Sequence, residues 1–166
     1  LPLGVEAVIG LAGELLTLED ILNSERLPET RALESWTGRP RGLHDFDLPK
    51  CALEVKSSIR KNNMRFNISV ASQLDDIPDR SLFIIHQLFR FYPSGLSVNS
   101  VVKRLQSGFK SSSAQQQFNA KIASAGYHLI HAPIYEEDEY RFLSEGNDTY
   151  EVIEDFPRLL SSSLAP

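Results

Sequence analysis

The chain has 166 residues, of which 42% are hydrophobic and 23% are charged, and its formal net charge is −5. These values are typical of one globular domain, residues 1–166, with a sizeable core. No apolar run approaches the roughly 18 to 20 residues that a membrane span needs, so we expect no membrane contact. The acidic balance excludes a broadly basic surface, and any nucleic-acid contact must come from a local cluster of cations.

The number of cysteines and the first residue indicate the expected cellular compartment and whether the sequence is part of a longer chain. The single cysteine, Cys51, excludes an intramolecular disulfide and a cysteine-based zinc site, and the cytoplasm is the expected compartment. The sequence begins at Leu1 rather than at a Met, so we expect a processed or trimmed piece of a longer chain. No Gly-Lys-Ser/Thr loop is present, which excludes NTP hydrolysis by this chain alone.

The first third of the chain reads as helical. Apolar residues at helical spacing predict a helix over 5–23, in which Gly10 and Gly13 mark close packing. A short helical turn follows over 28–35 and leads to Trp36. A loop rich in Gly, Arg and Pro then separates these helices from the next elements.

The middle of the chain reads as strands. Residues 43–48 and 51–58 are joined by the turn Pro49-Lys50, and so short a turn predicts an antiparallel hairpin. Residues 64–71 alternate well enough for a third strand of the same meander. The long apolar run 81–92 is expected to be a fourth, central strand.

The last part of the chain returns to helices and then to strands. Helices are predicted over 97–105 and over 113–124, the second one ended by Gly126. The order of elements therefore indicates an α/β fold with a central mixed sheet flanked by helices. Short strands are expected over 127–135, 139–143 and 149–153.

The most specific chemistry lies in the second strand of the hairpin, where Glu54 and Lys56 flank Val55. Side chains two residues apart share a face, so the two charges point the same way while Val55 points into a core. Alone, such a tripeptide is typical of an exposed sheet face with solvated charges or a Glu–Lys pair. Asp45, on the preceding strand, changes this reading because a hairpin can bring its carboxylate close to that of Glu54.

Two clustered carboxylates repel each other unless a cation lies between them, and Mg²⁺ prefers such hard oxygen ligands. A bound Mg²⁺ polarises a scissile phosphate and lowers the pKa of a bound water. Lys56 would orient that water or neutralise charge on the phosphate, because a lysine of ordinary pKa, about 10.4, is a donor rather than a base. Asp47 shares the face of Asp45, and spacing alone does not choose between them, although a solvated acid beside the turn is the simpler reading of Asp47.

The pattern of Asp45 followed by Glu54-Val55-Lys56 resembles the PD-(D/E)XK nuclease superfamily. His44 stands where the signature has Pro, and we expect a structural role for it. A longer ordered set resembles, more narrowly, the PD-(D/E)XK proteins encoded beside bacterial restriction and phage-defence genes. That set comprises Gly10-Leu11-Ala12-Gly13-Glu14-Leu15, Trp36-Thr37-Gly38, His44-Asp45-Phe46, Glu54-Val55-Lys56-Ser57-Ser58 and Phe156-Pro157-Arg158-Leu159.

The resemblance implies a restriction-endonuclease-like core in which Asp45 and Glu54 bind Mg²⁺, with Mn²⁺ as a substitute, and Lys56 assists the attacking water. It also implies that Glu14 completes the metal shell, whereas spacing alone favours an exposed helical acid. The implied function is a metal-dependent DNA endonuclease of bacterial restriction or phage defence, acting as a homodimer or with partner subunits. The alternative is a non-catalytic DNA-binding or assembly subunit that retains the fold.

A phosphate track is expected along the basic loop after the second strand of the hairpin. The candidate nucleic-acid contacts are Arg41, Ser58, Arg60, Lys61, Arg65 and Gln73. The ordinary alternatives are solvated surface charges for the basic residues, a plain strand residue for Ser58 and a turn residue for Gln73.

The acidic run 136–139 would repel a phosphate backbone, so we expect it away from the site or at a partner surface. His86, His128 and His131 have no zinc-site spacing and are expected in the core or on the surface.

Overall fold

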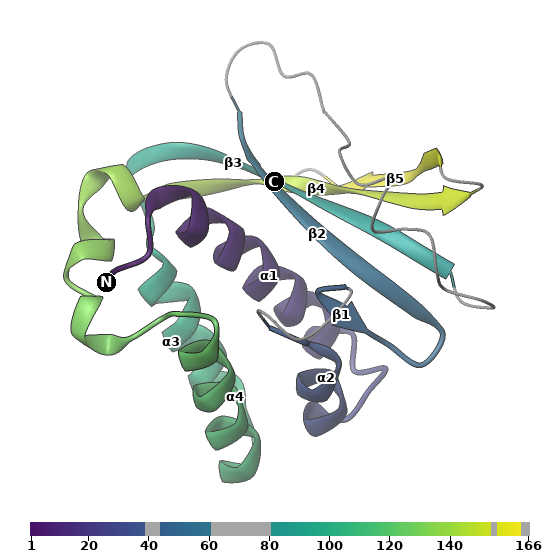
Figure 1. Cartoon of the computed structure of the whole chain (residues 1–166), viewed down its shortest axis with the longest axis horizontal. Helices are drawn as coiled ribbons and strands as arrows, with labels where there is room; N and C mark the ends of the chain where they lie inside the picture. Colours follow the sequence, from purple (N-terminus) through teal and green to yellow (C-terminus); the bar gives the residue numbers. More distant parts are fainter. Residues whose placement is uncertain (39–43, 61–80, 154–155, 164–166) are drawn as a thin grey trace.

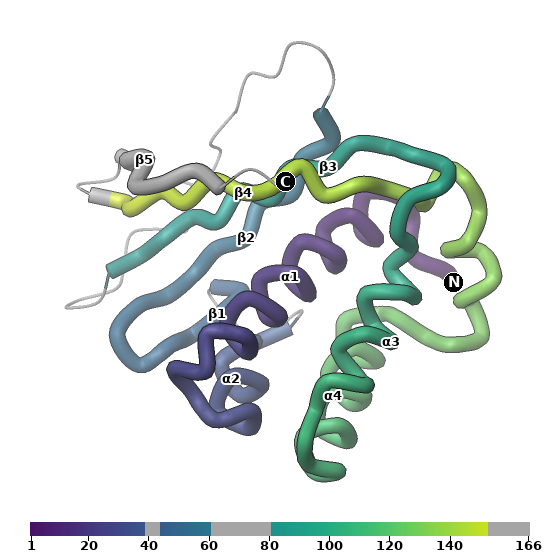
Figure 2. The backbone as a smooth tube through the Cα atoms, turned by 180° about the vertical axis from the view of Figure 1, so that it is seen from behind, coloured from purple at the N-terminus to yellow at the C-terminus, as the bar shows by residue number. Residues whose placement is uncertain are grey.

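The computed structural model of the chain describes residues 1–38, 44–60, 81–153 and 156–163, with the side chains from 153 onward outside that description. A single five-stranded sheet runs through them in the order β1-β2-β3-β4-β5. The α-helices gather on one side of this sheet, and α1 lies nearest to it (Figures 1 and 2). The predicted α/β fold with a mixed sheet is thus confirmed, with the described helices covering one face.

Helix α1 (Val5–Asn23) has the predicted bounds and packs directly on β2. A Cβ atom on Gly13 would lie 1.9 Å from Ser57 Oγ and 3.3 Å from Ser57 Cβ, so a larger residue would force the serine or the helix to shift. A Cβ on Gly10 would meet nothing within 4 Å. The expected close packing is therefore confirmed at Gly13 and wrong at Gly10.

Trp36 follows α2 (Glu29–Ser35) and joins the helices to the sheet. Its backbone forms an antiparallel bridge with Phe46, and its fully buried ring packs against Phe118 of α4. The Lys121 ammonium of α4 donates to the carbonyls of Leu33 and Trp36 at the end of α2. A cation satisfies the last carbonyls of a helix and favours the negative end of its dipole.

The predicted hairpin is confirmed: β1 (Phe46–Asp47) pairs antiparallel with β2 (Cys51–Ile59). On its other side β2 pairs with β3 (Ser81–Leu96), and these two strands are parallel. The expected fourth strand thus occupies the centre of the sheet and extends beyond its predicted end. The expected third strand, 64–71, lies outside the described residues.

The two later helices, α3 (Val98–Gly108) and α4 (Ser112–Ser124), also match the prediction closely. Ser97 and Ser100 form a reciprocal capping box at the start of α3, which satisfies two backbone N–H groups that a helix end leaves unpaired. Gly126, with φ of 94°, follows the end of α4 in a backbone conformation that favours glycine.

The predicted strands over 127–135 and 139–143 are wrong in large part. Three short 3-10 helices occupy most of this segment: η1 (Leu129–His131), η2 (Ile134–Glu136) and η3 (Asp138–Tyr140). Buried tyrosines produced the apolar signal here, but they fill the core from helical turns rather than from a strand. Glu136 anchors the segment, because its Oε1 accepts from Ser97 Oγ at 2.7 Å and from Asn99 Nδ2 at 2.6 Å.

Glu136 also receives Arg141 Nη2, and the pKa of its carboxyl is lowered by these hydrogen bonds and this cation, which outweigh the opposing effect of burial. The first acid of the run 136–139 therefore has a structural role.

The last two strands form an antiparallel pair, β4 (Phe142–Ile153) with β5 (Phe156–Ser163). The sequence predicted two short strands where β4 is continuous. Gly146, whose φ is 101°, lies between the two predicted strands, beside a bulge in the β3–β4 ladder. A bulge accommodates one extra residue without ending the strand.

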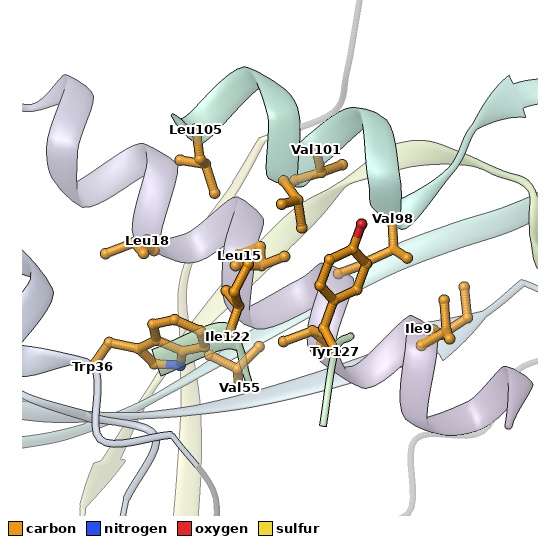
Figure 3. Close-up of a cluster of buried hydrophobic side chains, with 14 of the residues drawn as sticks. Ile9, Leu15, Leu18, Trp36, Val55, Val98, Val101, Leu105, Ile122 and Tyr127 are labelled. Atoms are coloured by element: carbon orange, nitrogen blue, oxygen red, sulfur yellow. The ribbon is translucent and has the colours of Figure 1, made fainter. Parts of the chain in front are cut away.

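The core lies between the sheet and the helices. Figure 3 shows Leu15 and Leu18 of α1 near Val101 and Leu105 of α3, with Val55 below them. None of the helices within the described ranges is both long and apolar enough to cross a membrane.

The contact between α1 and β2 gives a test with a matched control. We expect Gly13→Ala to lower the free energy of unfolding by about 1–2 kcal/mol, because the overpacking cost exceeds the gain in helix propensity. Gly10→Ala should raise it by about 0.5–1 kcal/mol, because that position is open. Urea denaturation of both variants measures the difference. Equal stabilisation by the two alanines would contradict the close approach at Ser57.

Candidate active site

The two faces of β2 have different roles. Leu53 and Val55 belong to the hydrophobic core beneath α1. Alternation along the strand turns Glu54 and Lys56 to the opposite side, which we call the outer face. In register with them on β3 are Ile84 and His86, both buried. The outer face thus comprises Glu54, Lys56, Ser58, Ile84 and His86.

Asp45 is held at the backbone of β2. It immediately precedes β1, whose register pairs Phe46 with Leu53 and Asp47 with Ala52. Asp45 Oδ2 accepts from the Val55 backbone N–H at 2.7 Å. The Asp45 carboxylate therefore lies at the β2 backbone, beside the residue that carries the second carboxylate.

Thr37 holds the backbone of this acidic residue. Its N–H donates to the Asp45 carbonyl at 2.9 Å, and its Oγ1 donates to the carbonyls of His44 and Asp45 at 2.6 and 3.2 Å. Together with the bridge between Trp36 and Phe46, these bonds pair the end of α2 with the start of β1. The Trp-Thr-Gly segment thus positions the Asp, although only the resemblance connected the two in the sequence.

Glu54 and Lys56 form a close ion pair. Lys56 Nζ donates to Glu54 Oε1 at 2.8 Å, and the lysine side chain remains 37% exposed whereas Glu54 as a residue is only 7% exposed. The expected Glu–Lys pair is present, but the alternative of a solvated, exposed face is wrong at Glu54. A buried carboxylate needs such a partner, because removing a charge from water is costly.

Glu14 is buried as well, with 8% of its surface exposed, so the expected exposed helical acid is wrong. Its Oε2 accepts from Trp36 Nε1 at 2.8 Å. Trp36 packs in the core on the α1 side of the sheet, whereas Glu54 points to the outer face. The described partner of Glu14 is therefore structural, a charge-assisted bond that ties α1 to the start of the hairpin.

The donor set limits how a metal would be held. In the described ranges, no group of three or more His, Cys, Asp or Glu side chains is placed to hold a metal ion, so Glu14, Asp45 and Glu54 do not form one three-ligand cluster. The carboxylates of Asp45 and Glu54 still fit Mg²⁺ in chemistry, since this ion often binds through one or two carboxylates and keeps several waters.

His86 is the residue that the sequence did not connect with the site. It lies beside Lys56 in the β2–β3 register, is 4% exposed, and its Nε2 shares a hydrogen bond of 2.7 Å with Ser58 Oγ. Burial lowers the pKa of the imidazole, and the negative charge of Asp148 on β4 opposes this effect only in part. A histidine that resists protonation adds no second positive charge next to Lys56.

Some of the remaining residues predicted for the site lie in the described part of the chain, and others lie outside it. Ser58 lies on the outer face, and Arg60 follows β2, where its Nη1 lies 3.4 Å from Glu145 Oε2. Asp47 is exposed near the hairpin turn. The remaining expected contacts lie outside the described residues: Arg41, Lys61, Arg65 and Gln73.

The lowered pKa of His86 predicts a pH dependence of stability. Below about pH 6.5 the unfolded chain takes up a proton that the folded His86 resists, so the free energy of unfolding falls as the pH drops from 6.5 towards the folded pKa. We expect urea denaturation at pH 7.5 and 5.5 to show a smaller loss in His86→Gln than in the wild type. The control is His128→Gln, an exposed position that should match the wild type. An unchanged loss in His86→Gln would contradict the assignment.

Comparison with known proteins places the chain in a family. No curated protein and no solved structure matches it. A family model matches the whole of residues 1–166, and its description reads "Putative PD-(D/E)XK family member". This confirms the resemblance read from the Asp45, Glu54 and Lys56 pattern. The chain belongs to the DUF4420 family, which is grouped by that description with the PD-(D/E)XK proteins.

Proposed function

We propose that the chain is a metal-dependent endonuclease that hydrolyses DNA phosphodiester bonds in bacterial restriction or phage defence. One observation carries the proposal: the Asp45 carboxylate is bound to the Val55 N–H, directly beside Glu54, and Lys56 Nζ lies 2.8 Å from Glu54 Oε1. Family membership supports the proposal, because an Asp followed by Glu-x-Lys is the pattern after which the PD-(D/E)XK proteins are named.

The two carboxylates would hold Mg²⁺, or Mn²⁺ in its place. When bound, the ion polarises the scissile phosphate and lowers the pKa of a coordinated water. Asp45 is oriented for this task by the Val55 N–H, which holds its Oδ2 at 2.7 Å. Glu54 is oriented by Lys56, which holds its Oε1. Both carboxylates thus have a set direction before substrate arrives, which avoids reorganisation during the reaction.

Lys56 is placed to act on the substrate as a hydrogen-bond donor. More than a third of its side chain is exposed, so it reaches solvent while its Nζ contacts Glu54. From there it would orient the attacking water and offset the negative charge that develops on the phosphate. Burial lowers the pKa of the neighbouring His86, which disfavours a second positive charge beside Lys56.

A second candidate is a non-catalytic DNA-binding or assembly subunit that retains the fold. Two observations favour it: Glu54 already has a cationic partner in Lys56, and no three-ligand metal cluster is found among the residues described. For the nuclease, a homodimer or partner subunits would be needed to cut both strands of a duplex, because one site cuts one strand.

The test is a cleavage assay on plasmid DNA with Mg²⁺ or Mn²⁺. We expect Glu54→Gln and Lys56→Ala to lose at least about 100-fold in rate, because each removes a group that acts on the transition state. Lys103→Ala on α3, an exposed lysine away from the outer face, is the matched control and should keep the wild-type rate.

Chelation of the metal with EDTA should abolish cleavage in the wild type. Glu54→Gln keeps the size of the side chain, so circular dichroism and thermal unfolding can separate loss of chemistry from loss of fold. The non-catalytic candidate predicts a different result: DNA binding without cleavage, in either metal, alone or with the proteins encoded next to it.

A further inference from the structure

A pair of arginines lies on the outer face beyond Lys56. Ile59 of β2 pairs with Phe89 of β3, and one further step sets Arg60 beside Arg90. The Arg60 N–H donates to the Phe89 carbonyl at 2.6 Å, which continues the ladder to this point. By alternation, both arginines point to the same face as Lys56.

One carboxylate joins the two arginines. Glu145 Oε1 lies 2.8 Å from Arg90 Nε, and Glu145 Oε2 lies 3.4 Å from Arg60 Nη1. Each oxygen of the carboxylate thus faces a different guanidinium. The arginine side chains are 64% and 56% exposed, so most of their donor groups still face solvent. The cluster carries two positive charges and one negative charge.

A bulge in the sheet supplies Glu145. In the β3–β4 ladder Leu88 pairs with Gly146 and Phe89 pairs with Ser144, so Glu145 is the extra residue between them. Bulges commonly change the direction of a side chain, and here the positive φ of Gly146 accompanies one. An exposed ion pair contributes only about 0–1 kcal/mol to the free energy of unfolding, so stability alone gives little reason for this ion-pair cluster.

We propose that Arg60 and Arg90 form a phosphate-binding pair for the DNA backbone, with the two-oxygen carboxylate of Glu145 occupying the space between the guanidinium groups until a phosphate displaces it. A phosphodiester also presents two non-bridging oxygens, and arginine recognises carboxylate and phosphate with the same donor geometry. The arriving phosphate takes the place of the carboxylate between the guanidinium groups.

The position of the pair sets which phosphate it binds. Arg60 lies four positions after Lys56, just beyond the end of β2, which corresponds to about 13 Å. One strand of B-form DNA advances about 3.4 Å along the axis per phosphate, so the pair contacts a phosphate a few nucleotides from the one at Lys56. This inference rests on the proposed function, since it takes DNA as the ligand of the outer face.

The test measures binding rather than cleavage. A fluorescein-labelled 20-base-pair duplex is titrated with the full chain in Ca²⁺ in place of Mg²⁺, across a series of salt concentrations. Each phosphate contact contributes about 0.9 to the slope of log K against log salt. We expect Arg90→Ala and Arg60→Ala each to reduce this slope by about one and to weaken binding about tenfold.

Two further variants sharpen the assignment. Arg90→Lys should keep most of the slope but lose affinity, because lysine retains the charge without the planar fork. Glu145→Gln should tighten binding, because it removes the anion that competes with the phosphate. The matched control is Arg104→Ala, an exposed arginine paired with Glu19 on α1, whose removal should change neither value.

The outcomes separate this inference from the proposed function. Unchanged affinity and slope in Arg60→Ala and Arg90→Ala would overturn the phosphate pair even if the wild type cleaves DNA. The same holds if Arg104→Ala weakens binding equally, or if the wild type does not bind the duplex. Binding that depends on both arginines, without cleavage in Mg²⁺ or Mn²⁺, would keep the pair and reject the nuclease.

Discussion

Trp36 is the residue on which the rest of this structure depends. Its side chain is fully buried, its backbone bridges to Phe46 at the start of the hairpin, and its indole N–H donates to Glu14 on α1. Lys121 of α4 donates to its carbonyl. One residue thereby links two helices to the start of the hairpin, next to Asp45. An aromatic ring of this size with a satisfied polar atom both fills a core and sets a direction.

The buried Glu14 follows from this arrangement. A carboxylate out of water is costly unless it is hydrogen-bonded or paired, and the Trp36 indole supplies one such bond. Removing the indole would leave that oxygen without this donor, and the cost would fall on the junction between α1 and the hairpin. Asp45 immediately precedes Phe46, so a change at Trp36 would reach the candidate site through the hydrogen bonds of Thr37 to the carbonyls of His44 and Asp45.

Local features of the sequence predicted the elements, and distant pairings remained hidden. The helix over 5–23 and the hairpin at Pro49-Lys50 follow from periodicity and a two-residue turn, which neighbouring residues determine. The parallel pairing of β2 with β3 depends on residues some 30 positions apart, and it alone brings His86 beside Lys56.

Other differences have equally physical causes. The burial of Glu14 depends on a tryptophan 22 residues away. The positive φ of Gly146, which glycine adopts readily, accompanies a bulge in β4, so that one continuous strand replaces the two short strands predicted. In each case the deciding contact involves residues far apart in the sequence, which local patterns do not reveal.

Strand register is the constraint that joins fold and chemistry. On β2, Leu53 and Val55 build the core while Glu54 and Lys56 carry the candidate chemistry. A slip of one residue would move every charge into the core and every apolar group out of it. Two contacts oppose such a slip from opposite sides of the strand: the Asp45 carboxylate on the Val55 N–H, and the approach of Gly13 to Ser57. The residue that would bind a metal therefore also sets the register that places its partner, so a mutation at Asp45 is expected to affect both chemistry and strand pairing.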